Sequence, residues 1–403
     1  MAYRKLSSLD AAGRRVFVRV DFNVPLSKDG GVADDTRIVA SLPTLRYLLE
    51  KKARIVVASH LGRPKGKRDP AQSLKPVRDV LERYLKRPVR FAESIVGPDA
   101  EALARGLGDG EVLLLENLRF DAREEANDPE FSRALASLAE AYVNDAFGSA
   151  HRAHASTVGI TAILTDVAAG FLMERELVAL GRLLGEPARP YVALLGGAKI
   201  SGKIDVITNL LPRVDRLVVG GGMMFTFLKA KGLATGRSLV EEDRVALATE
   251  ILAAPGNAAK IQLASDVLVA GSPDGSDPGR MAPATAIPDD AMGVDIGPES
   301  IAAIAATLAD ARTVFWNGPM GIFEVPPYAT GTLAVAAEVA RATKRGAFTV
   351  VGGGDSLAAV HRAGVESQIS HCSTGGGASL EFLEGRTLPG VAALDAASEP
   401  ARG

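Results

Sequence analysis

The sequence predicts an α/β protein of two domains, each built as a Rossmann-like three-layer α/β/α sandwich around a parallel sheet. Three observations support this class. Short apolar runs alternate with helical patterns along most of the chain, 403 residues exceed the length of one ordinary core, and a helical stretch ending in glycine and prolines interrupts the rhythm near the middle. Strand–helix alternation is typical of parallel sheets with helices on both faces, and long chains split into domains.

Apolar runs of strand length are expected to form the two sheets. In the first half these runs are Arg15–Phe22, Arg54–Ser59, Glu111–Glu116 and Ala141–Asp145, and in the second half Tyr191–Leu195, Leu217–Val219, Thr313–Trp316 and Phe348–Val351. Helical patterns lie between them, as at Ile38–Lys52 and Pro76–Leu85. Because parallel strands need long crossover connections, these intervening helices favour a parallel arrangement.

The boundary between the domains is expected at residues 171–190. Phe171–Leu184 has an amphipathic helical pattern, and the segment after it, Gly185-Glu-Pro-Ala-Arg-Pro190, contains the residues that end helices. The sequence therefore predicts a first domain over residues 1–170, an interdomain helix and hinge over residues 171–190 and a second domain over residues 191–386. The loop Gly271–Arg280, rich in Gly, Pro, Ser and Asp, is expected to be exposed.

Composition argues against several classes of protein. A net charge of -2 argues against a nucleic-acid binder. The single cysteine, Cys372, allows no internal disulfide, which fits a reducing compartment. The apolar runs are far shorter than the ~20 residues of a membrane helix, and the N-terminus lacks a signal-peptide pattern. We therefore expect a cytoplasmic protein without nucleic-acid or membrane partners.

Glycine clusters follow the predicted strands of the second half. They are Gly196-Gly197, Gly220-Gly221-Gly222, Gly318, Gly352-Gly353-Gly354 and Gly375-Gly376-Gly377. Ligands of parallel sheets bind at the carboxyl ends of strands, and glycine allows the backbone to approach a phosphate at a helix N-terminus. Any one cluster could be only a tight turn. Their repetition at corresponding strand ends indicates a nucleotide cleft.

One of these clusters nearly matches a phosphate-binding loop. The segment from Gly197 to Lys203 has the required spacing, but the next residue is Ile204 where the motif needs Ser or Thr to hold magnesium. A standard P-loop protein is therefore disfavoured. Asp355 is the best candidate for a magnesium ligand, although with Ser356 it could instead be a helix N-cap. No G-x-G-x-x-G fingerprint occurs, which removes the main support for a dinucleotide-dependent dehydrogenase.

The first half carries a different set of polar residues at its predicted strand ends. They are Asp21 and Asn23 after the first strand, His60 and Arg63 after the second, Arg119 after the third, Arg37 at the start of a helix, and Arg152 within His151-Arg-Ala-His154. Guanidinium groups suit phosphate and carboxylate, so the set predicts an anion pocket. Solvated surface arginines are the alternative. A metal site at the two histidines lacks a cysteine or a third clustered histidine.

Taken together, the motifs resemble the phosphoglycerate kinase family over essentially the whole chain. In the first half the matching segments are Arg19-Val-Asp-Phe-Asn-Val-Pro25, Ser59-His-Leu-Gly-Arg-Pro64, Glu116-Asn-Leu-Arg-Phe120, Asn144-Asp-Ala-Phe-Gly148 and His151-Arg-Ala-His-Ala-Ser156. In the second half they are Leu195-Gly-Gly-Ala-Lys199, Gly220-Gly-Gly-Met-Met-Phe-Thr-Phe227, Asp295-Ile-Gly-Pro298, Trp316-Asn-Gly-Pro-Met-Gly321, Gly352-Gly-Gly-Asp-Ser356 and Ser373-Thr-Gly-Gly-Gly-Ala-Ser379.

The resemblance implies a phosphoglycerate lobe and a nucleotide lobe, in a monomer whose residues after Thr387 return to the first lobe. The residues implied for 3-phosphoglycerate or 1,3-bisphosphoglycerate are Asp21, Asn23, Arg37, His60, Arg63, Arg119 and Arg152. Those implied for ADP or ATP are Lys199, Lys203, Gly220, Gly221, Gly222, Gly293, Asn317, Glu324, Gly352, Gly353, Gly354, Asp355 and Ser356. Asp355 is implied as the Mg²⁺ ligand, and Gly353, Gly354, Gly375 and Gly376 as backbone donors.

The expected reaction moves the acyl phosphate of 1,3-bisphosphoglycerate to ADP by positioning and charge neutralisation. Arg37 and Lys199 are expected to neutralise the moving group, helped by backbone near Gly353 and Gly376. Substrates held on separate lobes imply a closing hinge at residues 171–190. Two alternatives are a dehydrogenase and a catalytically inactive nucleotide-binding scaffold. The scaffold is disfavoured because Arg37, Lys199 and Asp355 are all present.

Overall fold

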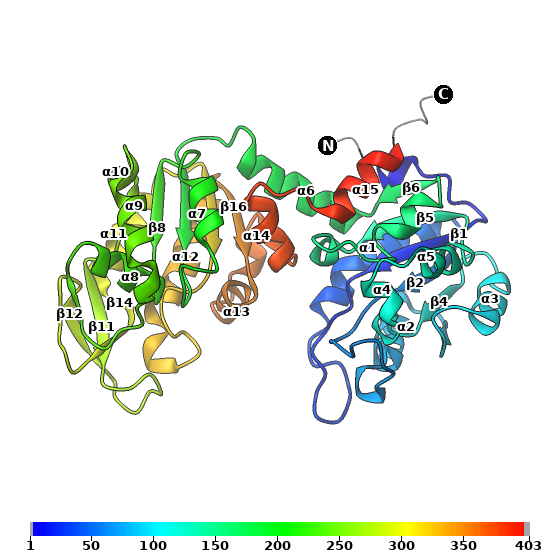
Figure 1. Ribbon diagram of the computed structural model, residues 1–403, viewed down its shortest axis with the longest axis horizontal. Helices are drawn as coiled ribbons and strands as arrows, with labels where there is room; N and C mark the ends of the chain where they lie inside the picture. Colours follow the sequence, from blue (N-terminus) through cyan, green and yellow to red (C-terminus); the bar gives the residue numbers. More distant parts are fainter. Residues whose placement is uncertain (1–2, 399–403) are drawn as a thin grey trace. The chain divides into compact units, whose positions relative to one another are not determined.

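The computed structural model of the chain describes residues 3–398, which divide into two compact units (Figure 1). Unit 1 consists of the described residues up to Val178 together with those from Thr387 onward, and unit 2 of Ala179–Arg386. The division falls inside helix α6 (Phe171–Leu184), which has the bounds expected from the sequence. Residues 399–403 of the predicted returning tail lie outside the described residues.

Unit 1 contains a six-stranded sheet in the order β3-β4-β2-β1-β5-β6, and every neighbouring pair is parallel. The strands are β1 (Arg15–Val20), β2 (Arg54–Ala58), β3 (Val89–Ala92), β4 (Val112–Leu115), β5 (Ala141–Asp145) and β6 (Val167–Ala169). Alternate residues face opposite sides of the sheet. Val16 and Val18 pack in one core with Leu45 and Leu81, and Phe17 between them stacks on Tyr142.

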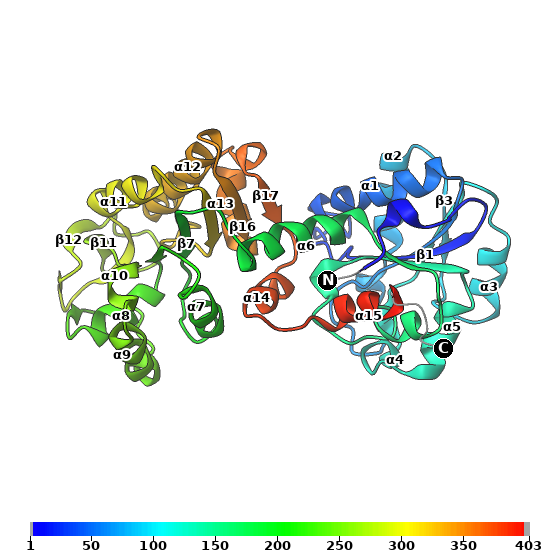
Figure 2. The ribbon, with the colours of Figure 1, turned by 90° about the horizontal axis from the view of Figure 1, so that it is seen from above.

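The helices of unit 1 cover both faces of this sheet. They are α1 (Thr36–Glu50), α2 (Lys75–Leu85), α3 (Pro98–Arg105), α4 (Ala122–Glu125), α5 (Pro129–Ala136) and α15 (Pro389–Ser398), with the 3-10 turns η1 (Leu6–Ser8), η2 (Pro70–Gln72), η3 (Leu118–Phe120), η4 (Phe147–Ser149) and η5 (Gly159–Ala162). Figure 2 shows α1 and α2 on one side of the sheet and α4, α5 and α15 on the other.

Helix α1 is displaced by two residues from the expected Ile38–Lys52. It begins before its first apolar residue, and there the carboxylate of Asp34 accepts the backbone N–H of Thr36, the first helical residue, at 2.8 Å. It ends earlier because Lys52 has a φ of 59°, in the left-handed region that terminates helices. This shift places Arg37 in the first turn of the helix.

Two contacts anchor the terminal helices of unit 1. The backbone N–H of Leu172 donates to Oδ1 of Asp145 at 2.8 Å, so the residue that ends β5 caps the N-terminus of α6. The backbone N–H of Gly390 in α15 donates to the carbonyl of Ala150 at 2.8 Å. A Cβ atom at position 390 would lie 3.0 Å from the Cα atom of Ala150, so this close approach favours glycine.

Unit 2 contains a second six-stranded parallel sheet, in the order β10-β8-β7-β15-β16-β17. The strands are β7 (Tyr191–Leu195), β8 (Arg216–Val219), β10 (Ile261–Gln262), β15 (Thr313–Asn317), β16 (Phe348–Gly352) and β17 (His371–Ser373). All the strands expected in this half are present, with bounds that differ by no more than one residue. The expected α/β class with two parallel sheets is confirmed.

Helices cover both faces of the second sheet as well. They are α7 (Ile204–Leu210), α8 (Met223–Ala230), α9 (Val245–Ala253), α10 (Asn257–Lys260), α11 (Pro298–Leu308), α12 (Thr330–Lys344), α13 (Gly354–Arg362) and α14 (Gly377–Leu383), with the 3-10 turns η6 (Glu242–Arg244), η7 (Pro326–Tyr328) and η8 (Glu366–Gln368). In Figure 2, α11, α12 and α13 lie on one side of the sheet and α7, α8, α9 and α14 on the other.

Unit 2 also carries an antiparallel sheet that the sequence reading did not predict. Its order is β12-β11-β14, from β11 (Asp266–Ala270), β12 (Arg280–Pro283) and β14 (Met292–Ile296), and a small parallel pair joins β9 (Ala234–Thr235) to β13 (Ala286–Ile287). The loop Gly271–Arg280 connects β11 to β12 and is exposed to partly exposed, as expected. Leu268, Val294 and Tyr328 form the core beneath this sheet.

Candidate functional site

The polar residues of the first half gather at the carboxyl edge of the sheet in unit 1. Asp21 follows β1, His60 follows β2, Arg119 lies in η3 after β4, and Arg37 lies in the first turn of α1. Nη1 of Arg37 lies 2.7 Å from Oδ2 of Asp21. A Cβ atom at Gly148 would lie 2.4 Å from that same oxygen, so a side chain there would disturb the ion pair.

Charge around His60 is distributed unevenly. Burial alone would raise the pKa of the Asp21 carboxyl, but the positive charges of Arg37 and Arg19 and the backbone N–H of Asn23 hold this pKa below its usual value. Burial lowers the pKa of His60 well below its usual 6.5, and Arg19, Arg119 and Arg37 act in the same direction against the opposing effect of Asp21. The imidazole is therefore neutral at pH 7, and the guanidinium groups supply the positive charge.

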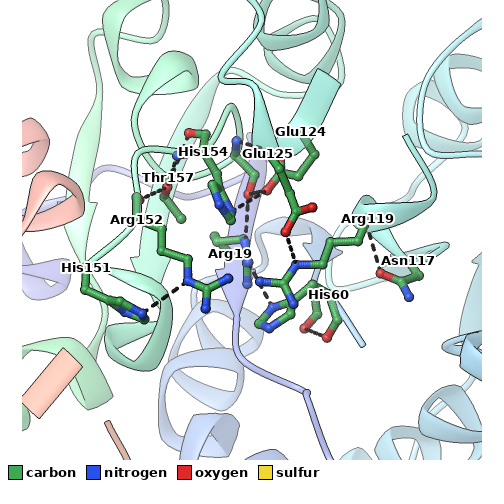
Figure 3. Close-up of polar contacts among 12 residues, drawn as sticks. Arg19, His60, Asn117, Arg119, Glu124, Glu125, His151, Arg152, His154 and Thr157 are labelled. Carbon is green, nitrogen blue, oxygen red and sulfur yellow. Dashed lines mark hydrogen bonds and ion pairs between the residues drawn. The ribbon is translucent and has the colours of Figure 1, made fainter. Parts of the chain in front are cut away.

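Hydrogen bonds join further predicted residues to this group. The backbone N–H of Gly62 donates to Oδ1 of Asn23 at 2.8 Å, and Nη1 of Arg119 donates to the carbonyl of Gly62 at 2.7 Å. Nε of Arg119 also lies 3.3 Å from Oε1 of Glu125. In Figure 3 the guanidinium group of Arg119 lies near the imidazole of His60, and the charge of Arg152 acts on Arg119.

Arg152 and Arg63 differ in how they are held. Nε of Arg152 donates to Nε2 of His151 at 3.2 Å. Arg152 also lies close enough to Arg119 for its charge to act there: burial lowers the pKa of Arg119, the charge of Arg152 lowers it further, and Glu125 opposes both. Arg63 is exposed, and no hydrogen bond or ion pair of residues 3–398 links it to the cluster. The structure therefore brings together the predicted anion-pocket residues except Arg63. We call the set Asp21, Asn23, Arg37, His60, Arg119 and Arg152 the anion cluster.

A buried polar layer behind the anion cluster was missed by the sequence reading. Arg19 in β1 is 1% exposed, and Glu124 in α4 is fully buried. Nε of Arg19 donates to Oγ of Ser156 at 2.8 Å, and that hydroxyl donates to Oε1 of Glu124 at 2.5 Å. The available signal was a charged residue inside an otherwise apolar strand, Arg15–Val20, because such a residue must be buried with a partner.

In unit 2 the glycines of two clusters, Gly197 and Gly221-Gly222, line a cavity of about 460 Å³. Five of the predicted nucleotide residues line it, namely Gly221, Gly222, Gly293, Glu324 and Asp355. Its apolar wall includes Phe225, Leu239 and Met292. A Cβ atom at Gly293 would lie 2.1 Å from Cζ of Phe225, so glycine at this position keeps the aromatic ring in place beside the cavity.

Lys203 and Asn317 form a linked pair beside this cavity. Nζ of Lys203 donates to the backbone carbonyl of Asn317 at 2.9 Å and to its Oδ1 at 2.5 Å. Burial lowers the pKa of Lys203 to about 8, against the opposing charge of Asp355. Nδ2 of Asn317 in turn donates to the carbonyl of Gly352 at 2.7 Å. A Cβ atom at Gly353 would lie 2.7 Å from Nδ2 of Asn317.

The remaining predicted glycines and Ser356 lie at the ends of strands. The hydroxyl of Ser356 accepts the backbone N–H of Gly318 at 2.6 Å, and Gly353, with a φ of 92°, immediately precedes α13. Gly376, with a φ of 55°, immediately precedes α14. Gly220 packs so closely on Met320 that a Cβ atom would lie 2.2 Å from its sulfur.

The loop that resembles a phosphate-binding loop has its backbone amides occupied by a side chain. Oε2 of Glu241 accepts the N–H groups of Ile200 at 2.5 Å and Ser201 at 3.1 Å, and Oε1 accepts the hydroxyl of Ser201 at 2.5 Å. Lys199 is exposed on this loop. Glu241 was missed by the sequence reading because it lies 40 residues from the loop that it binds.

Comparison with known proteins identifies this arrangement. A sequence model of the family described as phosphoglycerate kinase matches residues 6–386. The chain is 52% identical over 397 residues to the phosphoglycerate kinase of Synechococcus sp. (strain CC9311), covering 98% of both chains. It is 54% identical over 396 residues to that of Chlorobium chlorochromatii (strain CaD3), covering 98% of this chain and all of the relative. The chain belongs to the phosphoglycerate kinase family.

A solved structure agrees with this assignment. The structure of phosphoglycerate kinase from Coxiella burnetii covers 99% of this chain with a TM-score of 0.89 and 38% sequence identity. The resemblance drawn from the motifs is thus confirmed. The chain is a phosphotransferase with a carboxyl group as acceptor and has phosphoglycerate kinase activity in glycolysis.

Two structural findings concern the metal and the membrane. Phosphoglycerate kinases are generally Mg²⁺-dependent, yet no three His, Cys, Asp or Glu side chains of residues 3–398 gather as a metal site. Asp355, exposed in the first turn of α13, is one carboxylate at the edge of the cavity, and this fits magnesium that is held mainly by substrate phosphates.

Among the helices of the described residues, none has the length and apolar composition needed to cross a bilayer.

Proposed function

We propose that the anion cluster of unit 1 binds 3-phosphoglycerate and 1,3-bisphosphoglycerate. The observation that carries this assignment is the excess of guanidinium groups at one sheet edge. Arg37 is paired with Asp21 and Arg119 with Glu125, whereas Arg152 is bonded to the imidazole of His151 and adds a further positive charge beside Arg119. A ligand with both a phosphate and a carboxyl group matches several guanidinium forks. Asn23 adds a neutral donor, and Arg63 joins the ligand from its exposed loop.

The cavity of unit 2 is the proposed site of ADP and ATP. Its apolar wall of Phe225, Leu239 and Met292 suits a purine base, and Glu324 suits the ribose hydroxyls. The phosphates would then extend toward Lys203 and the glycine-rich strand ends, where backbone N–H groups are available. The proposed contacts on this side are Lys199, Lys203, Gly220, Gly221, Gly222, Gly293, Asn317, Glu324, Gly352, Gly353, Gly354, Asp355 and Ser356.

The proposed chemistry is a direct phosphoryl transfer. An oxygen of the β-phosphate of ADP bonds to the phosphorus of the acyl phosphate, the bond from phosphorus to the acyl oxygen breaks, and the carboxylate of 3-phosphoglycerate leaves as ATP forms. No side-chain nucleophile is needed. Arg37 and Lys199 neutralise charge on the moving group, and backbone N–H groups near Gly353 and Gly376 orient it. Mg²⁺ beside Asp355 adds positive charge at the nucleotide phosphates when bound.

This chemistry requires the acyl phosphate and the nucleotide to come within bonding distance. We therefore propose that the two units close when both substrates are bound, about the hinge at residues 171–190, and that closure excludes water from the reacting groups. Small-angle X-ray scattering with both ligands should show a smaller radius of gyration than without them, and an unchanged radius would contradict closure. We further propose a cytoplasmic monomer, which the glycolytic family supports.

ATP formation from ADP, Mg²⁺ and 1,3-bisphosphoglycerate tests the site assignments. Calorimetric titration of Arg119→Ala should show weaker binding of 3-phosphoglycerate and unchanged binding of ADP, and Lys203→Ala should show the reverse. Lys199→Ala should lower kcat with both ligands still bound. A variant that weakens binding of the ligand assigned to the other unit would overturn the assignment of the unit that carries the substitution. The activity of the wild type would still stand.

A further inference from the structure

A buried arginine contacts the inner edge of His60. Nη2 of Arg19 lies 3.1 Å from Nδ1 of His60, and Arg19 is 1% exposed (Figure 3). A guanidinium group carries only N–H donors and cannot lose a proton in a protein. Nδ1 of His60 must therefore be the acceptor in this hydrogen bond. The ring proton of the neutral imidazole then lies on Nε2.

The guanidinium of Arg19 is held in this orientation on its other edges. Its Nε donates to Oγ of Ser156 at 2.8 Å, and its Nη1 donates to the carbonyl of Val20. The Ser156 hydroxyl donates to Oε1 of Glu124 at 2.5 Å, and the Ser156 backbone N–H donates to Oε2 at 3.0 Å. Rotation of the guanidinium away from His60 would break these bonds in a place that water does not reach.

Glu124 has one clear role in this layer. It is fully buried, and it accepts the hydroxyl of Ser156, which in turn accepts Nε of Arg19. Burial raises the pKa of Glu124, and the charge of Arg19 and the two hydrogen bonds of Ser156 oppose this rise. The other neighbour of Glu124 is His154, whose Nδ1 lies 3.9 Å from Oε1, beyond hydrogen-bond distance. Glu124 therefore acts on Ser156 and Arg19 rather than forming an acid–base pair with His154.

We propose that Arg19, Ser156 and Glu124 are positioning residues that fix His60 as its neutral Nε2–H tautomer, so that the imidazole presents an N–H donor to the anionic substrate. This proposal rests on the proposed function only in taking 3-phosphoglycerate as the ligand that receives the donor. The charged groups that act on His60 are Arg19 from β1, Asp21 after β1, Arg37 from α1 and Arg119 from η3. The three cations favour the neutral ring, and Asp21 alone opposes them.

One consequence separates this arrangement from an ordinary histidine contact. A histidine that binds phosphate as an imidazolium loses its charge as the pH rises through ~6.5. A neutral Nε2–H donor does not titrate in that range. The contribution of His60 to substrate affinity should therefore stay constant between about pH 6 and 8.

Nitrogen NMR of the full-length enzyme without ligand tests the tautomer directly. The chain has five histidines, so ¹⁵N-histidine labelling gives few signals, and His60→Gln assigns the signal of interest. We expect long-range proton–nitrogen spectra at pH 7 to show a protonated Nε2 and an unprotonated Nδ1 for His60. A protonated Nδ1, or an imidazolium, would overturn the proposal. His361, with a side chain 83% exposed, provides an internal signal from outside the site.

Variants then test whether the buried layer fixes this tautomer. Ser156→Ala and Arg19→Met should both populate the Nδ1–H form of His60 and raise the KM for 3-phosphoglycerate about tenfold, the scale of one charge-assisted hydrogen bond. In both variants kcat should change little, because burial, Arg37 and Arg119 still favour the neutral ring. Arg19→Lys, which retains donors, should restore part of the wild-type spectrum. Arg15→Met, on the same strand, is the matched control and should change neither property.

Each result has a defined meaning. If Arg19→Met does not fold, the wild-type spectrum and Ser156→Ala still decide the question. A wild-type tautomer that persists in Ser156→Ala and Arg19→Met would overturn the role of the buried layer. Addition of 3-phosphoglycerate to the wild type separates the two proposals. If His60 is the Nε2–H tautomer and its NMR signals do not change when 3-phosphoglycerate is added, the tautomer is upheld but the proposed ligand of the anion cluster is contradicted.

Discussion

The guanidinium of Arg37 lies 2.7 Å from the carboxylate of Asp21, and its positive charge helps to keep this buried carboxyl ionised. Asp21 is 7% exposed. A carboxylate this deeply buried is stable only beside positive charge. Arg37 therefore has two roles in the proposed mechanism. It compensates the charge of the buried Asp21 carboxylate and offers its remaining N–H donors to the substrate.

Loss of the Arg37 side chain should damage catalysis more than binding alone would explain. We expect Arg37→Ala to lower kcat about 10²–10³-fold, because a preorganised charge is removed from the transition state. The pKa of Asp21 should rise in the same variant, since one of its stabilising cations is absent. Steady-state kinetics measure the first effect. Arg46→Ala, an exposed arginine on the same helix, is the control, and equal losses in both variants would contradict the role of Arg37.

The depressed pKa of Lys203 predicts how nucleotide use depends on pH. Burial lowers this pKa from 10.5 to about 8, so the ammonium of the free enzyme becomes a neutral amine above that pH. We expect kcat/KM for ADP, which reports on the free enzyme, to fall as the pH rises through about 8. In Lys203→Arg the fall should disappear, because a guanidinium keeps its proton. A profile that stays flat in the wild type would contradict this prediction.

The same shift has a consequence for stability with the opposite sign. The unfolded chain holds the proton of Lys203 up to about pH 10.5, whereas the folded chain releases it near pH 8. Between these values the unfolded state binds more protons, so this group makes the protein more stable as the pH rises. The contribution of Lys203 to stability is thus least favourable below pH 8, where kcat/KM of the enzyme for ADP is expected to be highest.

Sequence patterns could predict the strands and most of the residues at their ends. Glycine and arginine at the end of a strand can be recognised from the sequence, because periodicity shows where the strand ends and the residue type shows which chemistry it can supply there. Asp21, His60 and Arg119 were accessible in this way, as were the glycines that line the cavity of unit 2. The same reasoning did not show that Arg63 lies outside the hydrogen-bonded cluster, because the position of a side chain on an exposed loop is not set by the local sequence pattern.

Long-range partners could not be predicted from local pattern. Glu241 meets its loop across 40 residues and Glu124 meets Ser156 across 32, and no periodicity connects such positions. Arg19 appeared as part of an ordinary strand because a single sequence does not show which distant residues meet its guanidinium inside the fold. The antiparallel sheet of unit 2 was missed because β11 and β12 flank a loop whose composition alone indicates exposure.

The buried carboxyl of Asp145 predicts a dependence of stability on pH in the acid range. Burial raises the pKa of Asp145 from 3.8 to about 7, against hydrogen bonds from the amides of Leu172 and Met173. The folded state therefore binds more protons between these values, and stability falls as the pH rises from about 4 to 7. Asp145→Asn keeps an oxygen that can cap α6 and removes the titrating group.

Thermal unfolding of Asp145→Asn and the wild type measures this effect. The variant should gain stability relative to the wild type as the pH rises from about 4 to 7, with a constant difference above that range. The total gain should be on the order of a few kcal/mol at most. A difference that does not change with pH would show that Asp145 stays charged throughout and would contradict the raised pKa.

The contact between Glu241 and the loop of Lys199 predicts a specific defect in nucleotide use. Glu241 accepts two backbone N–H groups and the Ser201 hydroxyl, so it holds the loop from which Lys199 extends. Burial would raise the pKa of this carboxyl, but the hydrogen bonds of Ser201 and Ile200 together with the charge of Lys199 lower it. Glu241→Gln removes the charge and one accepting oxygen, which should leave the loop less ordered.

We expect Glu241→Gln to lower kcat about tenfold, the scale of one charge-assisted hydrogen bond, with little change in the KM for 3-phosphoglycerate. Glu242→Gln is a matched control, because the neighbouring Glu242 forms an ion pair with the exposed Lys229 at 2.8 Å. Initial rates with ADP and with 3-phosphoglycerate as the varied substrate measure both effects. An unchanged kcat in Glu241→Gln would mean that Lys199 reaches the transferred group from a mobile loop, and equal losses in the two variants would attribute the defect to surface charge.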